Sequence, residues 1–383
     1  MRYFGRKSSK LISKYIESYS EQGEILLDPF AGSGSSIEVA LKLSRRAIYN
    51  DLNPVAVIMA KANLLRKETK IELSKKYRYL YMINGKEVVY YVWEGDKIIR
   101  AKLSNGEIIG YQGSDYEGDI PYWYPKDPMY YNNNRPFIKK GKINSVDEFF
   151  TRRNLLILSE ILNEIPKDEK ALATFIATLY KASKMERERY GYFGVPAYWI
   201  PKRRVEKNPY LIFEKTLEMI NKKGYEKTEG DISKVLNGEA DITFLNVDAK
   251  RLPVQDNSVD LVVTDPPFYD EIQYFELFYL ATSWLRLKLD FDNEIIVNHN
   301  RGKDEKRYLS DLEKAVKEIH RVLKKDKYAI IMFHEESEEK VKEIKDILSS
   351  FFTITKQDTT EMRQRSIGHR GGRILEIFVM KKG

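Results

Sequence analysis

The tetrapeptide Asp265-Pro266-Pro267-Phe268 combines groups that can activate an aromatic amine. Such an amine is a poor nucleophile because its lone pair is delocalised into the ring. The Asp265 carboxylate and the Pro266 carbonyl can accept its two protons and draw the nitrogen toward sp3 geometry. The prolines stiffen the loop, and Phe268 offers a flat surface for stacking a base. An isolated DPPF can equally be a strand end capped by a Pro-Pro turn.

A second motif, DPFAGSG at residues 28–34, places a carboxylate and two glycines directly after an apolar run. A parallel sheet binds its ligand at the carboxyl ends of its strands, where Gly32 and Gly34 let a ligand approach the backbone closely. A lone GxG also fits a dinucleotide fold or a plain tight turn. The motif therefore needs support from neighbouring strands.

The next two apolar runs supply that support, because each ends in an acid. Asp51 stands where a carboxylate can hold the two hydroxyls of a ribose. It can also be the N-cap of the helix that follows Pro54. Asp248 lies at the end of the third run and is suited to the exocyclic amine of an adenine ring. These acids predict a nucleoside site at one edge of the sheet.

Alternating strands and helices position these residues. Residues 24–66 read as strand, helix, strand, helix. From about Asp241 the pattern returns, with strands at 241–249, 260–268 and 328–336, helices at 275–289 and 309–325, and a final antiparallel pair at 351–360 and 373–382. This order predicts an α/β fold with a mostly parallel sheet and helices on both faces.

Residues 67–240 have a different character and predict an inserted α+β domain. Short β segments at 77–83, 87–93, 98–103 and 108–113 alternate with Asn-Gly and similar turns, which are typical of hairpins. Helical segments follow around 146–164, 169–187 and 207–222. The catalytic domain is accordingly predicted at 1–66 and 241–383, with β-hairpins at 77–113 and helices within about 146–222 in the insert.

Composition narrows the class of protein. The 383 residues carry a net charge of +8, which favours nucleic acid as a partner. With no cysteine and four scattered histidines, we expect no metal site. No apolar run approaches the roughly 20 residues that a membrane-spanning helix needs. The opening segment MRYFGRKSSK has no apolar stretch behind its charges, so we expect no signal peptide and a cytoplasmic protein.

DPFAGSG followed by a long insert and DPPF resembles the S-adenosylmethionine-dependent DNA amino-methyltransferases, which act on adenine N6 or cytosine N4. The resemblance covers residues 1–66 and 241–383 and implies a Rossmann-like class I methyltransferase sheet. It implies S-adenosyl-L-methionine as cofactor and double-stranded DNA as partner. The predicted cofactor-binding residues are Tyr3, Phe4, Lys7, Asp28, Pro29, Phe30, Ala31, Gly32, Gly34, Asp51, Leu52, Asp248 and Ala249, the first three from the resemblance alone.

More narrowly, WYPKDPMYYNNNRPF and HRGGRILEIF resemble a prokaryotic branch of adenine-specific DNA methylases described with a zinc ribbon. The chain departs from that branch because it has no cysteine, so the ribbon cannot be present. The hairpins at 77–113 can occupy its place. The departure puts target recognition in doubt and leaves the chemistry unaffected.

The target base cannot be reached inside a duplex, so it is expected to flip into a pocket lined by Phe268, Tyr269 and Tyr274. Tyr274 can equally belong to the core of its helix. The predicted phosphate contacts are Lys139, Lys140, Arg152, Arg203, Arg204, Arg370 and Arg373. Most charge runs are simply solvated faces, so each cluster is an open alternative between the two.

Several functions remain open. Asp at the first position of the catalytic motif is more usual in adenine enzymes, and cytosine N4 is the alternative target. A transfer-RNA guanine-N2 methyltransferase has a similar sheet and motif. A protein-glutamine methyltransferase usually has Asn in place of Asp265. A homologue that has lost catalysis would keep only DNA binding. A restriction or defence partner and the oligomeric state stay undecided.

Overall fold

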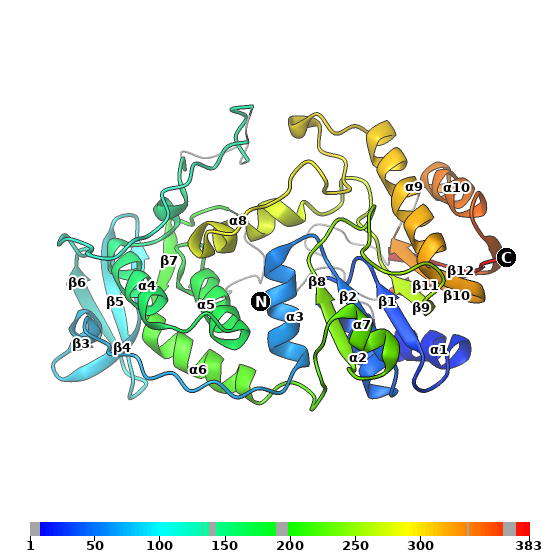
Figure 1. The fold of residues 1–383 in the computed structure, drawn as a ribbon. Coiled ribbons are helices and arrows are strands. Elements are labelled where there is room, and N and C mark those ends of the chain that lie inside the picture. The colour runs from blue at the N-terminus through cyan, green and yellow to red at the C-terminus, as the bar shows by residue number, and fades with distance from the viewer. Residues whose placement is uncertain (1–7, 132, 138–142, 189–197, 335–336, 363–372) are drawn as a thin grey trace. The chain divides into compact units, whose positions relative to one another are not determined.

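The computed structural model describes residues 8–131, 133–137, 143–188, 198–334, 337–362 and 373–383 (Figure 1). Their contacts divide the chain into two compact units. The first comprises 61–225 and 275–288, and the second comprises the described residues of 8–60, 226–274 and 289–383. Residues 226–240 therefore count with the second unit and 275–288 with the first, unlike the predicted boundaries.

A seven-stranded sheet forms the centre of the second unit. Its order is β11-β12-β10-β9-β1-β2-β8. The strands are β1 (Ile25–Asp28), β2 (Arg46–Asn50), β8 (Ile242–Leu245), β9 (Val259–Thr264), β10 (Leu323–His334), β11 (Thr353–Met362) and β12 (Arg373–Lys381). Pairing is parallel from β8 to β10, whereas β12 runs antiparallel to β10 and β11. The predicted Rossmann-like, mostly parallel sheet with an antiparallel carboxyl-terminal strand is confirmed.

Helices cover both faces of this sheet (Figure 1). Helices α1 (Ser9–Tyr19) and α2 (Ser35–Lys42) lie on one face, and α9 (Glu305–Val322) and α10 (Glu338–Ser349) lie on the other. Apolar side chains recur on α9 at Tyr308, Leu312 and Ile319, all of them buried against the sheet core. That spacing is what one apolar face of an α-helix requires. The unit also contains the short helices α7 (Ile232–Asn237) and η3 (His299–Arg301), and α3 (Pro54–Leu64) begins in it.

The first unit is an antiparallel sheet with helices. Its strands are β3 (Met82–Ile83), β4 (Lys86–Glu94), β5 (Lys97–Leu103), β6 (Ile108–Gly113) and β7 (Arg203–Lys207). Its helices are η2 (Val146–Phe149), α4 (Arg152–Glu164), α5 (Glu169–Ala182), α6 (Pro209–Asn221) and most of α8 (Tyr274–Leu285). The Trp284 ring packs edge-on against Phe150 and Phe175, at centroid distances of 5.6 and 5.7 Å. These contacts tie α8 to this unit.

One local prediction in this unit was wrong, and one strand was missed. Residues 77–83 are mostly not a strand, since Arg78–Tyr81 form the 3-10 helix η1 and only Met82–Ile83 pair with β4. The buried Tyr81 hydroxyl donates to Asn154 Oδ1 at 2.7 Å, a long-range contact that local propensity does not contain. The segment Arg203–Lys207, for which the sequence predicted no strand, pairs with β4 as the strand β7.

Two properties of the described residues bear on the class of protein. None of their helices has the length and apolar character needed to cross a membrane. They also contain no group of three His, Cys, Asp or Glu side chains arranged to hold a metal ion. A cytoplasmic location and a metal-free reaction remain predictions.

Candidate active site

Asp28 is the residue on which the glycine turn is built. It ends β1, is 4% exposed, and accepts hydrogen bonds from the Phe30 N–H at 3.0 Å, from Thr264 Oγ1 at 2.6 Å and from Ser36 Oγ. These bonds join the ends of β1 and β9 to the start of α2. Burial raises the pKa of Asp28 to about 7. Asp28 therefore shapes the turn, and a direct contact with the cofactor remains a prediction.

Two glycines of the turn adopt backbone conformations that side chains disfavour. Gly32 has φ +49° and Gly34 has φ +75°, both in the left-handed region. The Gly34 N–H donates to the Ala31 carbonyl at 2.7 Å, and the Ala31 N–H donates to the Asn50 carbonyl at 2.9 Å. Pro29 is buried and Phe30 half-buried. The turn thus lies against the end of β2, directly before α2.

Asp51 connects that turn to the second strand. Its Oδ2 accepts from the Gly32 N–H and its Oδ1 from the Asn53 N–H, each at 2.8 Å. The N-cap of α3 is Asn53, whose Oδ1 accepts from the Val55 N–H at 3.0 Å. Burial raises the pKa of Asp51 to about 6. The alternative of Asp51 as the cap is therefore wrong, and Asp51, beside the half-buried Leu52, stays a candidate for the ribose.

Two asparagines that sequence reasoning missed tie three strand ends together. The buried Asn50 side chain donates to the carbonyls of Pro29 and Val247, at 3.0 and 3.1 Å. The Asn246 side chain donates to the carbonyls of Asp51 and Leu52, at 2.7 and 3.0 Å. An asparagine at the end of an otherwise apolar strand is the signal that could have predicted each of these side-chain contacts.

Asp248 and Ala249 follow β8 at the same edge. Asp248 Oδ1 accepts from the Lys250 N–H at 2.9 Å, and Asp248 Oδ2 lies 3.6 Å from Lys250 Nζ. Ala249 is 5% exposed and belongs to the apolar core cluster. Asp248 is thus held in a fixed position after β8, as its predicted role toward an adenine amine requires.

The DPPF motif lies next to the glycine turn. Strands β1 and β9 pair in parallel with Leu27 opposite Val262, so the residues after Thr264 emerge beside Asp28. The negative charge of Asp265 contributes to raising the pKa of Asp28 and of Tyr274. Burial is the first cause of the raised Tyr274 pKa, and Asp51 adds to it after Asp265. The structure therefore brings Asp28, Asp51, Asp265 and the half-buried Tyr274 together.

Three consecutive backbone carbonyls of the loop after β9 accept hydrogen bonds. The carbonyls of Pro267, Phe268 and Tyr269 accept hydrogen bonds from Tyr308 Oη at 3.0 Å, the Glu271 N–H at 3.0 Å and the Val297 N–H at 2.9 Å, respectively. No donor among the described residues reaches the Pro266 carbonyl. That carbonyl thus keeps its capacity to accept a proton donor from a ligand.

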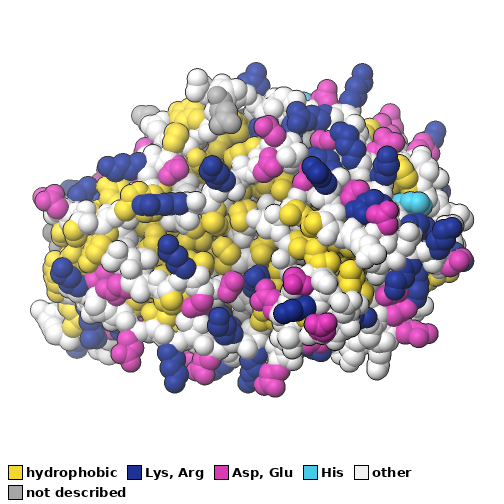
Figure 2. Space-filling model, in the orientation of Figure 1, with side chains coloured by type: hydrophobic (Ala, Val, Ile, Leu, Met, Phe, Trp, Pro, Cys, Tyr) yellow, Lys and Arg dark blue, Asp and Glu magenta, His cyan; other side chains and the backbone are white. Residues whose placement is uncertain are grey.

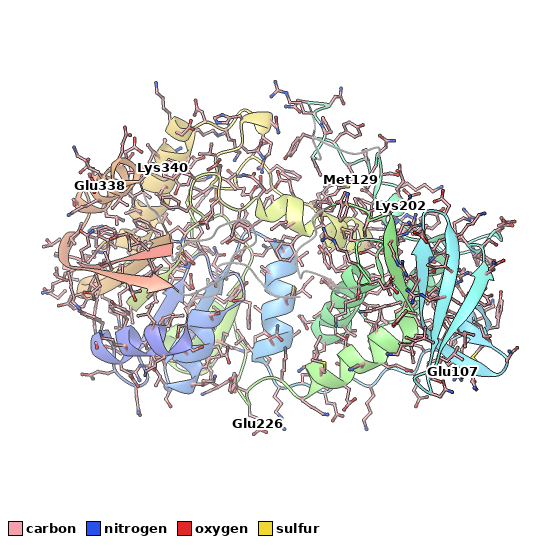
Figure 3. All side chains as sticks on the ribbon, turned by 180° about the vertical axis from the view of Figure 1, so that it is seen from behind. Glu107, Met129, Lys202, Glu226, Glu338 and Lys340 are labelled. Carbon is pink, nitrogen blue, oxygen red and sulfur yellow. The ribbon has the colours of Figure 1, made fainter. Side chains whose placement is uncertain are left out.

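The two aromatic residues of the loop are placed differently from the prediction. Phe268 is 9% exposed and stacks on Phe333, with ring centroids 5.4 Å apart and planes at 11°. Tyr269 is 2% exposed and donates to Glu343 at 2.5 Å, and Lys340 of α10 (Figure 3) lies 4.5 Å from its ring centroid. Both rings belong to the apolar core cluster of the second unit, whereas the sequence predicted them as the lining of a base pocket.

The predicted phosphate contacts fall into three groups. Arg204 is 7% exposed and lies over the Trp93 ring at 5.2 Å, so its prediction as a surface contact is wrong. The exposed Arg152 donates to the Gly118 carbonyl at 2.8 Å, and Arg203 pairs with Glu188 at 2.5 Å. Outside the described residues lie Lys139, Lys140, Arg370, the side chain of Arg373 and the predicted cofactor residues Tyr3, Phe4 and Lys7.

Charges of both signs are interspersed on the molecular face that Figure 2 shows. Lys and Arg side chains alternate there with Asp and Glu, and no broad patch of one sign stands out. The net charge of +8 is therefore not concentrated on this face. DNA contacts of individual basic residues remain predictions.

The residues at the sheet edge fit the cofactor that the motifs imply. Asn53 Nδ2 is buried and has no hydrogen-bond partner within the described part of the chain, next to the Asp51 carboxylate. A buried donor without a partner costs about 1 to 3 kcal/mol, which a bound acceptor would offset. S-adenosylmethionine offers hydroxyl and carboxylate acceptors for Asn53 and hydroxyl donors for Asp51. The turn, Asp51, Asn53 and Asp248 are the residues that would hold it.

Cofactor affinity is expected to fall as the pH drops below about 6. Ionised Asp51 is the form that accepts hydroxyl donors well, and its pKa before binding is about 6. Binding then releases a proton below that pH, so each further pH unit should weaken the affinity about tenfold. Calorimetric titration between pH 4.5 and 8 measures this, and Asp51→Asn should give weaker, pH-independent binding. The same pH dependence in Asp51→Asn would assign the titration to another group.

Comparison with known proteins gives sequence relatives. Residues 1–62 match the family model described as DNA methylase. The Type II methyltransferase M.MvaI of Kocuria varians is 25% identical over 367 residues, an alignment that covers 79% of this chain and 68% of that protein. The finer resemblance to a zinc-ribbon branch stays a prediction.

Solved structures show weaker likenesses. TrmN from Thermus thermophilus aligns over 98% of this chain and 48% of that one, at 10% identity and a TM-score of 0.31. A putative DNA modification methylase from the same organism aligns over 36% of this chain and 52% of that one, at 15% identity and a TM-score of 0.23. Neither score bears on the fold, which rests on the strand order described above. The amino-terminal match and the relative thus show that this chain is similar to DNA methylases, and its strand order is the one described above.

Proposed function

We propose that the protein methylates the exocyclic amine of a flipped-out base in double-stranded DNA. Adenine N6 is the target that Asp265 favours, and cytosine N4 is the alternative. The observation that carries the proposal is the position of Asp265 and of the Pro266 carbonyl, directly after β9 and beside the glycine turn. Among the described residues, no donor reaches the Pro266 carbonyl. Two acceptors at the cofactor edge are what an aromatic amine needs in order to become a nucleophile.

Each residue has a definite task in this reaction. S-adenosylmethionine supplies an electrophilic methyl group on sulfur. Asp51 holds the ribose hydroxyls, and Asp248 accepts from the adenine amine of the cofactor. Asp265 and the Pro266 carbonyl would accept the two protons of the target amine, which would leave its lone pair available for the methyl group that bound S-adenosylmethionine would supply. The nitrogen gains a methyl group and loses one proton, which the Asp265 carboxylate is placed to accept.

Target recognition is assigned to the first unit. Residues 61–225 and 275–288 form a compact body of their own, and exposed aromatic side chains at Tyr79, Trp123 and Trp199 give it groups that can contact nucleic acid. Because the relative is a Type II methyltransferase, a place in restriction and modification follows as part of the proposal.

Incubation with methyl-labelled cofactor and duplex DNA, followed by digestion to nucleosides, tests the function. Label in N6-methyl-2′-deoxyadenosine supports the favoured target, and label in N4-methyl-2′-deoxycytidine supports the alternative. Transfer to RNA guanine in place of DNA would favour the RNA methyltransferase alternative. DNA binding without any transfer, in protein shown to bind cofactor, would favour a homologue that has lost catalysis.

A further inference from the structure

Tyr308 contacts the catalytic loop from outside the motif. It lies in the first turn of α9 and is 1% exposed. Its hydroxyl donates to the Pro267 carbonyl at 3.0 Å, and its ring centroid lies 4.5 Å from that of Tyr269. A helix on one face of the sheet is thereby fixed to the residue that follows the proposed acceptor carbonyl.

Two consecutive prolines make this contact important. Neither Pro266 nor Pro267 has a backbone N–H, so the segment can be held only through its carbonyls and its side-chain packing. The Pro267 ring also locks φ of Pro267, the torsion about the bond that joins its nitrogen to its Cα. A hydrogen bond that fixes the Pro267 carbonyl therefore limits how far the neighbouring Pro266 carbonyl can turn.

The residue at the end of the loop is held against its own preference. Tyr269 has φ +40°, in the left-handed region that an aromatic residue rarely adopts. Its carbonyl accepts from the Val297 N–H at 2.9 Å, its hydroxyl donates to Glu343 at 2.5 Å, and its ring packs on Tyr308. Such a conformation persists only where the surroundings over-determine it. Tyr308 helps to hold this conformation, because it contacts both Pro267 and Tyr269.

We propose that Tyr308 is a positioning residue that aims the Pro266 carbonyl at the target amine. The inference rests on the proposed function, because it assigns the use of that carbonyl in methyl transfer. Tyr308 acts through Pro267 and does not itself touch the substrate. The Gln273 side chain supports the same loop, since Gln273 Nε2 donates to the Val297 carbonyl at 3.1 Å.

Tyr308→Phe isolates the hydroxyl, because it keeps the ring that packs on Tyr269. Loss of one buried hydrogen bond is expected to slow single-turnover methyl transfer about tenfold at saturating cofactor and DNA. The dissociation constant for S-adenosylmethionine should change less than about twofold, since Asp51 and the glycine turn are untouched. Amide hydrogen exchange across residues 268–271 should become faster, a readout that does not depend on activity.

Tyr91→Phe is the matched control. Tyr91 is 2% exposed and likewise donates its hydroxyl to a backbone carbonyl, that of Leu80 at 3.1 Å, in the first unit. Tyr91→Phe should lower thermal stability by a similar amount. It should leave the transfer rate and the amide hydrogen exchange at residues 268–271 unchanged. Unchanged exchange in Tyr308→Phe, or a transfer rate equal to that of Tyr91→Phe, overturns the positioning role. If the wild-type protein transfers no methyl group but the expected difference in exchange is seen, the proposed function is contradicted. The hydrogen bond from Tyr308 to the Pro267 carbonyl then has only a structural role.

Discussion

Asp265→Ala is expected to lower the single-turnover rate of methyl transfer at least a hundredfold, on the order of 3 kcal/mol. In the proposed reaction the carboxylate accepts an amino proton as the nitrogen rehybridises, so its interaction with the base would strengthen toward the transition state. An interaction of that kind affects the rate far more than it affects binding. Under the proposed function, DNA affinity would come mostly from phosphate contacts, and the turn, Asp51 and Asp248 would hold the cofactor.

Neither dissociation constant should therefore move by more than about tenfold in Asp265→Ala. Asp270 provides the control, because it is an exposed acid in the same loop whose carbonyl, not its carboxylate, accepts from Gln273. Asp270→Ala should keep the wild-type rate. Near-normal transfer by Asp265→Ala would remove the catalytic assignment, and an equal loss in both variants would point to a disturbed loop.

The parallel sheet could be predicted from the sequence because its signals are local and repeated. Apolar runs such as 25–28 and 259–264 end in an acid or directly before one, and amphipathic helices separate them. In these segments the local pattern of apolar and polar residues agrees with the fold that long-range packing selects. Where the local pattern and long-range packing disagreed, the prediction failed. The segment 77–83 has strand propensity, but the buried Tyr81 hydroxyl is held by Asn154, which is 73 residues away.

The candidate site was predictable in its acids and less so in its geometry. Asp51 and Asp265 were found because strand ends of a parallel sheet meet at one edge. The braces at Asn50, Asn246 and Tyr308 were missed, since each acts on a carbonyl of a residue distant in sequence. The rings of Phe268 and Tyr269 were placed in the pocket on residue type alone, whereas the apolar core around Phe333 takes them in.

A buried carboxylate in the first unit gives the largest expected effect on stability. Glu206 is 3% exposed and accepts hydrogen bonds from Trp93 Nε1 at 2.6 Å and from Thr151 Oγ1 at 2.7 Å. Arg153 donates to both of its oxygens, at 3.0 and 2.9 Å, and the Tyr81 hydroxyl oxygen lies 3.2 Å from Glu206 Oε1. Donors from β4 and from the start of α4 thus converge on one side chain of β7.

Glu206→Ala is expected to destabilise the first unit by about 3 to 5 kcal/mol, because it leaves the buried Arg153 guanidinium without its counter-charge. Glu188→Ala is the control. Glu188 pairs with the exposed Arg203 and the half-buried Arg100, both of which keep contact with solvent, so its loss should cost no more than about 1 kcal/mol. Thermal unfolding followed by hydrogen exchange measures each unit separately.

If target recognition resides in the first unit, Glu206→Ala has a specific functional signature at a temperature where only that unit has opened. Site-specific methylation of DNA should be lost, while S-adenosylmethionine binding persists, since none of the residues around Asp51 belongs to that unit. Glu188→Ala should keep both activities. Loss of cofactor binding in the same transition as methylation would show that the two units unfold as one, and retained specific methylation after the first unit has opened would take target recognition away from it.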